Sequence, residues 1–259
     1  MPEGLEAEIW RSALDALVGR TITDVWIDDR VADPGLAVVL PGSMVERIER
    51  CGKVIRIHTP DHVLGLHFGM TGRVIVDGVA PIESLEYASD KDRPAWDRLR
   101  LGTAGATGTD IPALRVNDPR RLGRSSLDAD LDHLGVDILS VDADLLAAAL
   151  DGRRAAIKTV LLDQTVVAGL GNLCADEVLW WSGVAPQRGV DSLTEPEVGS
   201  IASAIAVRLP IMLRRGGSTK GELNPNTRQA LGSCPRDLAP LQRATIGGRT
   251  AVWCPEHQQ

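Results

Sequence analysis

The chain has 259 residues, 44% of them hydrophobic and 24% charged, which is typical of a globular protein with a substantial core. It contains no stretch of about 18 apolar residues, and its first residues, MPEGLEAEIW, are acidic rather than basic. Neither a membrane span nor a secretory signal is therefore expected, and the predicted location is the cytoplasm. Taken alone, the formal net charge of −7 disfavours a polyanionic partner.

The charge is unevenly distributed along the chain. Residues 200–253 contain eight Lys and Arg against two Asp and Glu, a local excess of six positive charges. A basic groove on an acidic body has this asymmetry, so the composition is compatible with a nucleic-acid partner. A solvated charged face is the alternative interpretation.

The first half of the chain is predicted to be a helix followed by strands. Apolar residues recur at helical spacing from Leu5 to Leu17, shortly before Gly19, a typical helix stop. From residue 21 to 123, short apolar or alternating runs such as KVIRIH and ALRVND are separated by Pro, Gly and Asp, as in strands joined by turns. So many strands need two packed layers, and we expect a β-sandwich or barrel flanked by the helix.

The second half of the chain is predicted to be helical. Residues 124–133 are polar and mark the expected boundary. Four helical patterns follow, ADLLAAALDG, RAAIKTVLLDQ, NLCADEVLWWSG and PEVGSIASAIAVRLPIMLRR, and Pro210 is expected to kink or split the last helix. Beyond Gly216 the chain is rich in Gly, Pro, Asn and Arg, and it ends in a small unit with two cysteines.

The clearest local motif lies at the C-terminus. Cys234 and Asp237 are separated by two residues, sixteen residues follow, and Cys254 and His257 repeat the spacing. Paired ligands at this spacing on a hairpin close the tetrahedron of a structural zinc site. Aspartate is a weaker structural ligand than cysteine, so a degenerate finger held by packing alone is the alternative. Four cysteines in this context do not indicate a disulfide framework.

A glycine-rich turn separates two of the predicted helices. Asn172 follows the residues GLG, at the position of a helix N-cap. Exposed amides at such a terminus can receive a phosphate. The alternative is a turn between packed helices, with Asn172 only a cap and with Gly169 and Gly171 merely permitting the turn.

Six segments, in order, resemble one protein family: MPEGLE, CGKVIRI, LHFGMTGR, NDPRRLGR, LLDQTVVAGLGNLCADE and IGGRTAVWC. Together they are similar to formamidopyrimidine-DNA glycosylase and its relative endonuclease VIII, and closer to the former. The resemblance spans essentially the whole chain. It implies an α+β multi-domain protein with a catalytic β-sandwich domain at 1–124, a helix-two-turn-helix domain at 134–222 and a zinc-finger-like hairpin at 228–259.

The resemblance also implies a base-excision-repair enzyme that is both a DNA glycosylase and a lyase for abasic sites. Pro2, exposed by removal of Met1, would attack the sugar C1′ of a damaged nucleotide and form a Schiff base, since an unprotonated α-amine is a suitable nucleophile. Glu3 would be the general acid and base, and Glu6 a supporting carboxylate. Lys53, on a strand, would bind a phosphate next to the lesion and help catalysis. Without the resemblance, Glu3 and Glu6 are interpreted as acids at the N-terminus of a helix, where the helix dipole favours negative charge.

Five further residues are implied to contact duplex DNA. Asn172 and Arg249 would grip neighbouring phosphates so that the damaged nucleotide is flipped out. Met70 would fill the vacated space, Arg120 would face the orphaned base and Leu122 would wedge beside it. For Met70 and Leu122, core packing is the alternative. The protein is expected to be a monomer without a redox or organic cofactor.

Several departures from the family pattern bear on the substrate. Leu5 replaces the usual proline, Leu122 replaces an aromatic wedge, two zinc cysteines are replaced, and the stretch from Gly217 to Cys234 is shorter than the family's. These changes leave the sugar chemistry intact and put the damaged base in doubt. Met70 and Arg120 favour oxidised purines over oxidised pyrimidines.

A second class of function is a non-catalytic protein of the same fold that binds damaged DNA. Such a binder has no need of a processed terminus carrying Pro2 and Glu3, so these two residues favour the enzyme. A zinc-ribbon interaction module leaves the N-terminal half unexplained.

Overall fold

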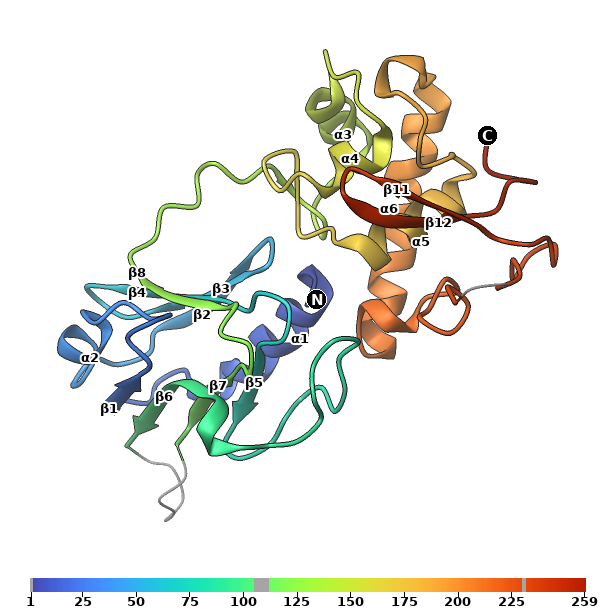
Figure 1. The fold of residues 1–259 in the computed structure, drawn as a ribbon. Coiled ribbons are helices and arrows are strands. Elements are labelled where there is room, and N and C mark those ends of the chain that lie inside the picture. Colours follow the sequence, from blue (N-terminus) through green and yellow to red (C-terminus); the bar gives the residue numbers. More distant parts are fainter. Residues whose placement is uncertain (1, 105–111, 230–231) are drawn as a thin grey trace. The chain divides into compact units, whose positions relative to one another are not determined.

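The computed structural model describes residues 2–104, 112–229 and 232–259 (Figure 1). The chain divides into two compact units. The second unit consists of Glu3–Leu5 together with Asp132–Gln259, and the first unit is formed by the chain up to Leu131 apart from those three residues. Each unit has its own hydrophobic core.

The chain opens with the predicted helix. Helix α1 spans Gly4–Leu14 and continues as a single 3₁₀ turn, Asp15–Leu17. Gly19 ends this segment at a φ of +82°, which glycine adopts without steric cost. Trp10 is fully buried against Phe68, with ring centroids 4.5 Å apart, so the apolar stripe of the helix enters the core of the first unit.

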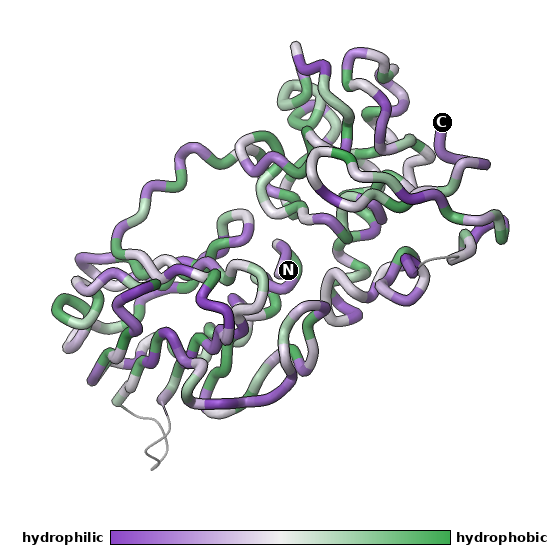
Figure 2. The backbone as a smooth tube through the Cα atoms, viewed as in Figure 1, coloured by the Kyte–Doolittle hydropathy of each residue, from purple (hydrophilic) through white to green (hydrophobic). Residues whose placement is uncertain are grey.

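Two four-stranded antiparallel sheets form the first unit, and their inner faces share one core, so the predicted β-sandwich is confirmed. Hydrophobic and hydrophilic stretches are mixed along the chain of this unit (Figure 2), and residues alternate clearly in strands such as β6, DRLRLGT. The first sheet has the order β1-β6-β7-β5 and consists of β1 (Ile22–Ile27), β6 (Asp97–Thr103), β7 (Leu114–Asn117) and β5 (Arg73–Val76). The second has the order β2-β3-β4-β8 and consists of β2 (Arg47–Cys51), β3 (Val54–His58), β4 (Val63–His67) and β8 (Arg124–Leu127). A short helix, α2 (Leu36–Val39), follows β1.

Strand β8 is a departure from the expected polar boundary segment. Its sequence, RSSL, carries no apolar alternation, yet Ser125 is buried and the strand pairs with β4 from Leu64 to His67. Pairing of its backbone with β4 stabilises this strand, because an exposed sheet edge offers unpaired amides and carbonyls to any segment that reaches it. The expected linker therefore begins only after Leu127.

The second unit contains the four predicted helices around a core of aliphatic residues, including Leu5. A parallel pair of two-residue strands lies among them. The helices are α3 (Ala143–Leu150), α4 (Ile157–Leu162), α5 (Asn172–Ser182) and α6 (Glu195–Arg215), and the strands are β9 (Val136–Asp137) and β10 (Val167–Ala168). Short 3₁₀ turns follow at Val190–Ser192 and Ser218–Lys220.

Helix α6 continues through Pro210, so of the two expected effects, a kink or a split, the split is excluded. A proline removes one backbone donor, and the packing of Ile205, Leu209 and Met212 in the core compensates for this loss. Among the described residues, α6 alone is long and apolar enough to cross a membrane, a property that core helices share. Ile205, Leu209 and Met212 of α6 are buried in the core of the second unit.

The chain ends in the predicted hairpin. Strands β11 (Gln242–Ile246) and β12 (Arg249–Trp253) are antiparallel and joined by Gly247 and Gly248, both at positive φ. Beside the hairpin, a small cluster of buried residues contains Trp180, Leu223, Cys234 and Cys254.

Candidate active site

Glu3 caps a helix far from it in the sequence. Its carboxylate accepts hydrogen bonds from the backbone amides of Gly171 (3.0 Å), Leu173 (2.8 Å) and Cys174 (3.1 Å), at the start of α5. The side chain is only 2% exposed. Three N–H donors and the positive end of the helix dipole hold both carboxylate oxygens in one orientation.

The start of α5 differs from the expectation that Asn172 is its N-cap. The N-cap is Gly171, which has no side chain to accept a bond, and Asn172 is the first helical residue. The amides at the start of α5 were expected to donate to an Asn side chain or to a phosphate. They donate to the carboxylate of Glu3 instead. A Cβ on Gly171 would lie 2.3 Å from Cδ of Glu3, so only glycine leaves room for the carboxylate there.

Asn172 keeps unused hydrogen-bonding capacity. Its Oδ1 is buried and has no hydrogen-bond partner among the described residues. A buried polar atom without a partner is uncommon in folded proteins and is a reason to look for a ligand. Because Asn172 follows Gly171 directly, its side chain starts within one residue of the Glu3 carboxylate cradle.

Arg249 is exposed at the first position of β12, directly after the two-glycine turn of the hairpin. The turn lies against α4, since a Cβ on Gly247 would lie 2.6 Å from Oγ1 of Thr159. The hairpin therefore presents the Arg249 cation directly after its turn, while the turn itself contacts α4 and β12 is bonded to Asp176 of α5.

Lys53 lies in the two-residue turn between β2 and β3, so its expected place on a strand is wrong. Gly52 precedes it at a φ of +59°, which allows the tight turn. Lys53 directly precedes Val54, the residue of β3 that pairs with His67, and His67 is exposed. Desolvation of its ring and the positive charge of Lys53 lower the pKa of His67. Sequence reasoning missed His67, although it stands in the quoted segment LHFGMTGR.

Two loops of the first unit are fixed by one carboxylate. Asp118 accepts hydrogen bonds from the Thr71 hydroxyl and from the amides of Arg120 (3.2 Å) and Leu122 (2.7 Å). Met70 and Leu122 are 36% and 43% exposed, so neither is the core residue that the alternative interpretation requires. Asp118 was also missed; its position before a proline and a turn was the available signal.

The four predicted metal ligands lie together. One ligand atom from each of Cys234, Asp237, Cys254 and His257 falls within 4.8 Å of the others. The Sγ of Cys234 is 3.8 Å from Nδ1 of His257, Sγ of Cys254 is 3.3 Å from Oδ2 of Asp237, and that oxygen is 2.9 Å from the same Nδ1. Bonds of about 2.0–2.3 Å to a central zinc would give ligand separations of roughly 3.3–3.8 Å. The two sulfur contacts lie in this range, and the contact between Asp237 and His257 is shorter, as in a direct hydrogen bond.

The surroundings of this cluster also suit a metal. Nε2 of His257 lies 3.3 Å from the carbonyl of Trp180, which leaves Nδ1 to face the other ligands. The indole N–H of Trp180 donates to Sγ of Cys234 over 3.3 Å, a contact that stabilises a thiolate. Burial raises the pKa of the Cys254 thiol to about 11, and a metal ion would bind it as the thiolate. The residues present therefore fit a metal ion.

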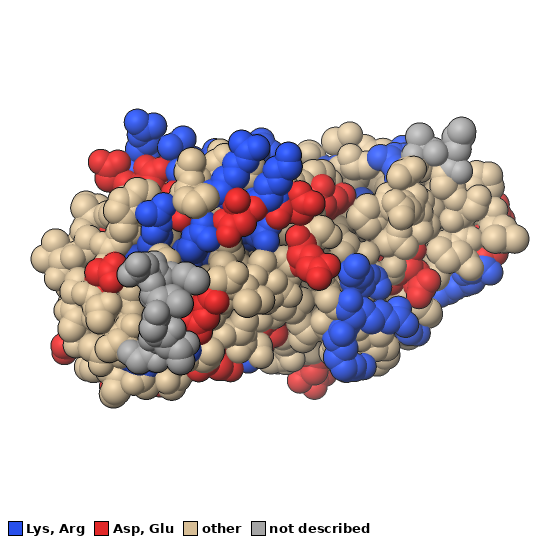
Figure 3. Space-filling model, turned by 90° about the horizontal axis from the view of Figure 1, so that it is seen from below, with Lys and Arg blue, Asp and Glu red and all other residues tan. Residues whose placement is uncertain are grey.

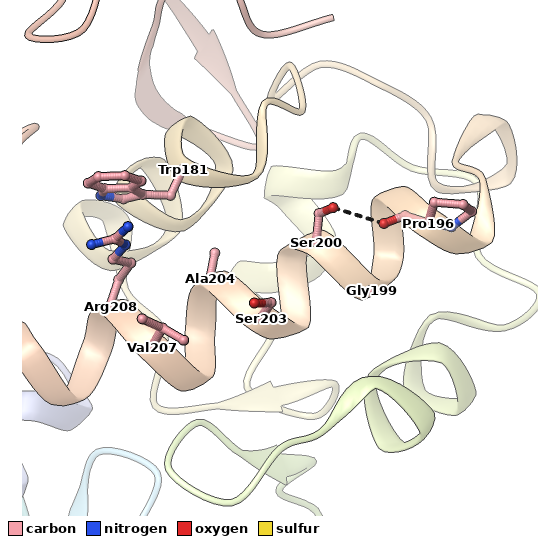
Figure 4. Close-up of a pocket in the computed structure, with 8 residues that line it drawn as sticks. All are labelled: Trp181, Pro196, Gly199, Ser200, Ser203, Ala204, Val207 and Arg208. Carbon is pink, nitrogen blue, oxygen red and sulfur yellow. Dashed lines mark hydrogen bonds between the residues drawn. The ribbon is translucent and has the colours of Figure 1, made fainter.

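The pocket in Figure 4 contains none of the predicted site residues. It has a volume of about 390 Å³ and lies along α6, where Arg208 stacks on Trp181 with its guanidinium carbon 3.3 Å from the ring centroid. Figure 3 shows Lys and Arg in separate groups, interleaved with Asp and Glu, on the face drawn. Neither feature marks a nucleic-acid surface by itself.

The predicted residues thus fall into two sets. In the second unit, Glu3 is next to Asn172, Arg249 lies at the hairpin tip and the metal ligands are clustered. In the first unit, Lys53 is beside His67, and the loops bearing Met70, Arg120 and Leu122 share one anchor. Met1, whose removal the mechanism requires, lies outside the described residues.

Comparison with known proteins gives the family. The model of the formamidopyrimidine-DNA glycosylase N-terminal domain matches residues 1–125, and that of the formamidopyrimidine-DNA glycosylase H2TH domain matches residues 134–222. The formamidopyrimidine-DNA glycosylase of Corynebacterium jeikeium is 30% identical, with 98% of each chain covered. That of Stenotrophomonas maltophilia strain K279a is 32% identical over the whole of both chains.

Solved structures agree with this assignment. The complex between the Lactococcus lactis Fpg and an abasic site containing DNA has a TM-score of 0.81 at 25% identity, with 99% of each chain covered. The wild-type Lactococcus lactis Fpg with DNA containing N7-benzyl-Fapy-dG also has a TM-score of 0.81, at 26% identity over the whole of both chains. The fold and its site define a DNA glycosylase with a helix-two-turn-helix unit. The chain belongs to the formamidopyrimidine-DNA glycosylase family, and the predicted family, fold class and enzyme class are confirmed.

Proposed function

We propose that this enzyme excises damaged bases from duplex DNA and then cleaves the abasic site, with the amine of Pro2 as the nucleophile. The observation that carries the proposal is the Glu3 carboxylate. It directly follows Pro2 in the chain and is held by three amides at the start of α5. This contact fixes the proposed proton-transfer group next to Asn172, a proposed phosphate ligand.

The proposed reaction balances with the groups of this chain. The lone pair of the Pro2 nitrogen forms a bond to C1′ as the glycosidic bond breaks, and the base leaves with the bonding electrons and takes up a proton from water. The proton on the Pro2 nitrogen passes to the Glu3 carboxylate, which gives it to the ring oxygen as the sugar opens to the iminium form. The Glu3 carboxylate then takes a proton from C2′ as the 3′ phosphate leaves, and a second elimination, with loss of another carbon-bound proton, expels the 5′ phosphate. No redox or organic cofactor is needed.

The DNA contacts are proposed residue by residue. Lys53, Asn172 and Arg249 would bind backbone phosphates, with Asn172 donating from its side-chain N–H group. The cation in a tight turn, the place of Asn172 at the start of α5 and the exposed Arg249 support these roles. Met70 and Leu122 would fill the space of the flipped nucleotide, with Arg120 facing the opposite base. Their exposure on two loops with a shared anchor supports this role.

The substrate class is proposed to be oxidised purines. The similar Lactococcus lactis protein has been solved with DNA containing N7-benzyl-Fapy-dG and also with DNA containing an oxidized pyrimidine, so the fold accepts both classes. Met70 and Arg120 favour purines here. We further propose the functional parts 1–124, 134–222 and 228–259, a monomer as the active form, and a cytoplasmic location.

The cluster at Cys234, Asp237, Cys254 and His257 can bind a metal ion, and we propose that the ion is structural zinc. Two thiolates, one imidazole and one carboxylate are all zinc ligands, and four protein ligands close the coordination sphere. Zinc would supply a crosslink between the 234–237 segment and the end of β12. This would hold the hairpin that carries Arg249 in shape.

The proposed chemistry is tested by incubating the protein with abasic-site DNA and borohydride, which reduces the iminium to a stable amine. Wild type should form a covalent adduct, and Pro2→Gly or a form that retains Met1 should form it at a sharply reduced rate. Glu3→Gln should fail to release a damaged base from duplex DNA. Duplexes with oxidised purines, oxidised pyrimidines and bulky adducts then establish the preferred lesion.

The alternative function, a non-catalytic damage-binding protein, makes the opposite prediction. Such a protein would bind abasic-site DNA without forming any adduct, with or without Met1. Tight binding and no adduct from the wild-type protein would therefore refute the lyase proposal.

A further inference from the structure

A cluster of buried charges lies at the centre of the second unit, outside the residues already considered. Lys158 of α4 is fully buried, Asp176 of α5 is 1% exposed, and Arg228, from the segment after α6, is 7% exposed. Nζ of Lys158 is 2.7 Å from Oδ1 of Asp176, and Nη1 of Arg228 donates to Oδ2.

The same three side chains hold the backbone of β12. Nζ of Lys158 donates to the carbonyl of Thr250 over 2.7 Å, and Nη2 of Arg228 lies 3.4 Å from that carbonyl. The amide of Val252 donates to Oδ2 of Asp176 over 3.0 Å. These hydrogen bonds fix the backbone of β12 at two positions, Thr250 and Val252. They connect it to α4, to α5 and to the segment that carries Arg228.

The charges of the cluster are balanced within the unit. Two cations face one carboxylate, and the negative charge of Glu3 also favours the charged form of Lys158, against the desolvation that lowers its pKa. A buried ion network is a weak source of stability, because desolvation offsets much of the attraction. What it supplies well is a single fixed geometry, since each charge must meet its partner.

The geometry that this cluster fixes involves both proposed phosphate ligands of the unit. Asp176 follows Asn172 by four residues, one turn along the same face of α5. Thr250, held by both cations, directly follows Arg249. We propose that Lys158, Asp176 and Arg228 are positioning residues that fix Arg249 relative to Asn172, so that the two can grip one DNA backbone together.

This inference rests on the proposed function of Arg249 as a phosphate ligand. It is tested with a double-mutant cycle of Arg228→Met and Arg249→Ala. Arg228→Met keeps the length of the side chain and leaves Lys158 and Asp176 as a neutral pair, so the unit should still fold. The Kd for a duplex with a stable abasic-site analogue is measured from about 50 to 200 mM salt, a range over which phosphate contacts change the affinity strongly.

Loss of one phosphate contact lowers the slope of log Kd against log salt by about 0.9. We expect Arg249→Ala to show this change and to raise Kd about tenfold, which corresponds to the loss of about 1.4 kcal/mol of binding free energy. Arg228→Met should show the same change in slope and a similar rise in Kd, although Arg228 is buried. The double variant should be no worse than the Arg249 variant alone. A merely structural defect would lower the melting temperature and leave the slope unchanged.

Two further variants complete the experiment. Arg228→Lys retains a cation for Asp176 and should recover much of the slope that Arg228→Met loses. The matched control is Arg208→Met, which removes a cation stacked on Trp181 at the other end of α5 and should leave the slope as in wild type. Equal loss in the control, or additive losses in the double variant, would overturn this inference while Arg249 remains a ligand. An Arg249→Ala variant with wild-type Kd and slope would refute the proposed role of Arg249, and the inference with it.

Discussion

Glu3 shows what sequence can and cannot say about a single residue. Its place after Pro2 in a family-like start predicts a functional carboxylate, and the alternative was an acid at the start of its own helix. In the structure it caps α5 instead, through contacts with residues about 170 positions away. Backbone amides leave no mark in a sequence, and a partner so distant has no periodicity, so the residue could be predicted and its contacts could not.

The metal ligands are the opposite case at the same scale. All four were identified from spacing alone, because two residues between ligands and a hairpin between pairs restrict the distances geometrically. Lys53 and Asp118 were harder. The turn that carries Lys53 was hidden inside a strand-like run, and the role of Asp118 depends on a loop brought to it by the sandwich.

Zinc binding gives a prediction for one of these ligands. Asp237→Ala should lower the affinity for zinc by more than about tenfold, because a structural site needs four ligands to close its coordination sphere. The wild-type protein should contain one equivalent of zinc by metal analysis, and competition with a chromogenic chelator measures the affinity of each variant. Glu256→Ala is the matched control, since Glu256 is an exposed acid between two ligands of the same site.

Two results would contradict the zinc proposal. One is a wild-type protein that is free of metal after purification in zinc-containing buffer and has full DNA affinity. The other is an Asp237→Ala variant that binds zinc as tightly as wild type. The first result would favour the finger held by packing alone, and the second would show that Asp237 is not a zinc ligand.

At the scale of elements, the start of α5 separates two glycines that the sequence presents alike. Gly169 has a φ of +108°, so it serves the turn, as predicted. Gly171 has a φ of −122°, which any residue adopts, and its reason is steric: it makes room for Glu3. From the sequence, both are interpreted as turn glycines. The atom that would clash with a side chain at Gly171 belongs to Glu3, at the other end of the chain, so the local sequence does not reveal it.

Gly171→Ala should therefore impair catalysis without backbone strain. The added methyl group would occupy the position of the Glu3 carboxylate, so we expect base release to fall by at least about a hundredfold, the usual contribution of a general acid or base. Single-turnover release from a damaged duplex, with the enzyme in excess, measures this rate. Binding of the abasic-site analogue should change much less.

Gly199→Ala is the matched control for this substitution. Gly199 lies inside α6, and a Cβ there meets no atom within 4 Å. Alanine should raise the stability of the helix by up to about 1 kcal/mol and leave base release unchanged. Base release at the wild-type rate in Gly171→Ala would show that the position of the Glu3 carboxylate is not required.

At the scale of the whole molecule, alternating patterns predicted the sandwich, and helical spacing predicted the four helices. Both periods are local properties of the chain, which is why they can be read from it. Strand β8 and the unbroken α6 were not predicted, because each depends on what the rest of its unit offers, a free sheet edge in one case and a hydrophobic core in the other. Buried ion pairs are equally hard to predict from the sequence, because their partners come from separate strands and loops.

One such group crosses the first unit. Asp28 lies directly after β1 and accepts hydrogen bonds from Arg98 of β6 (3.1 Å) and from Arg121 (2.8 Å). The side chain of Arg98 is itself buried and also donates to the carbonyl of Asp118. Burial acts to raise the pKa of Asp28, but the bonds from Arg121 and the charges of both arginines outweigh it. The pKa of Asp28 is therefore lowered from its ordinary 3.8.

This shift predicts how stability depends on pH. Because the pKa of Asp28 is lower in the folded state, its stabilising effect is complete above the unfolded value of 3.8 and is lost as the pH falls through the lower folded value. Asp28→Asn should lower the unfolding free energy of the first unit by roughly 2 kcal/mol at neutral pH, as for other hydrogen bonds to charged groups. The difference from wild type should shrink below a pH of about 3.8.

Hydrogen exchange of the β1 and β6 amides measures this free energy for the first unit alone, so no assumption about cooperative unfolding of the whole chain is needed. The control is Asp29→Asn, which changes the exposed neighbour in the same way and should alter protection little at any pH. Were the Asp28→Asn deficit to stay constant down to a pH of about 3, its cause would be the lost shape of the side chain rather than its charge. A deficit that disappears in acid would show that the ionised carboxylate between Arg98 and Arg121 stabilises the sandwich that positions the Met70 and Leu122 loops.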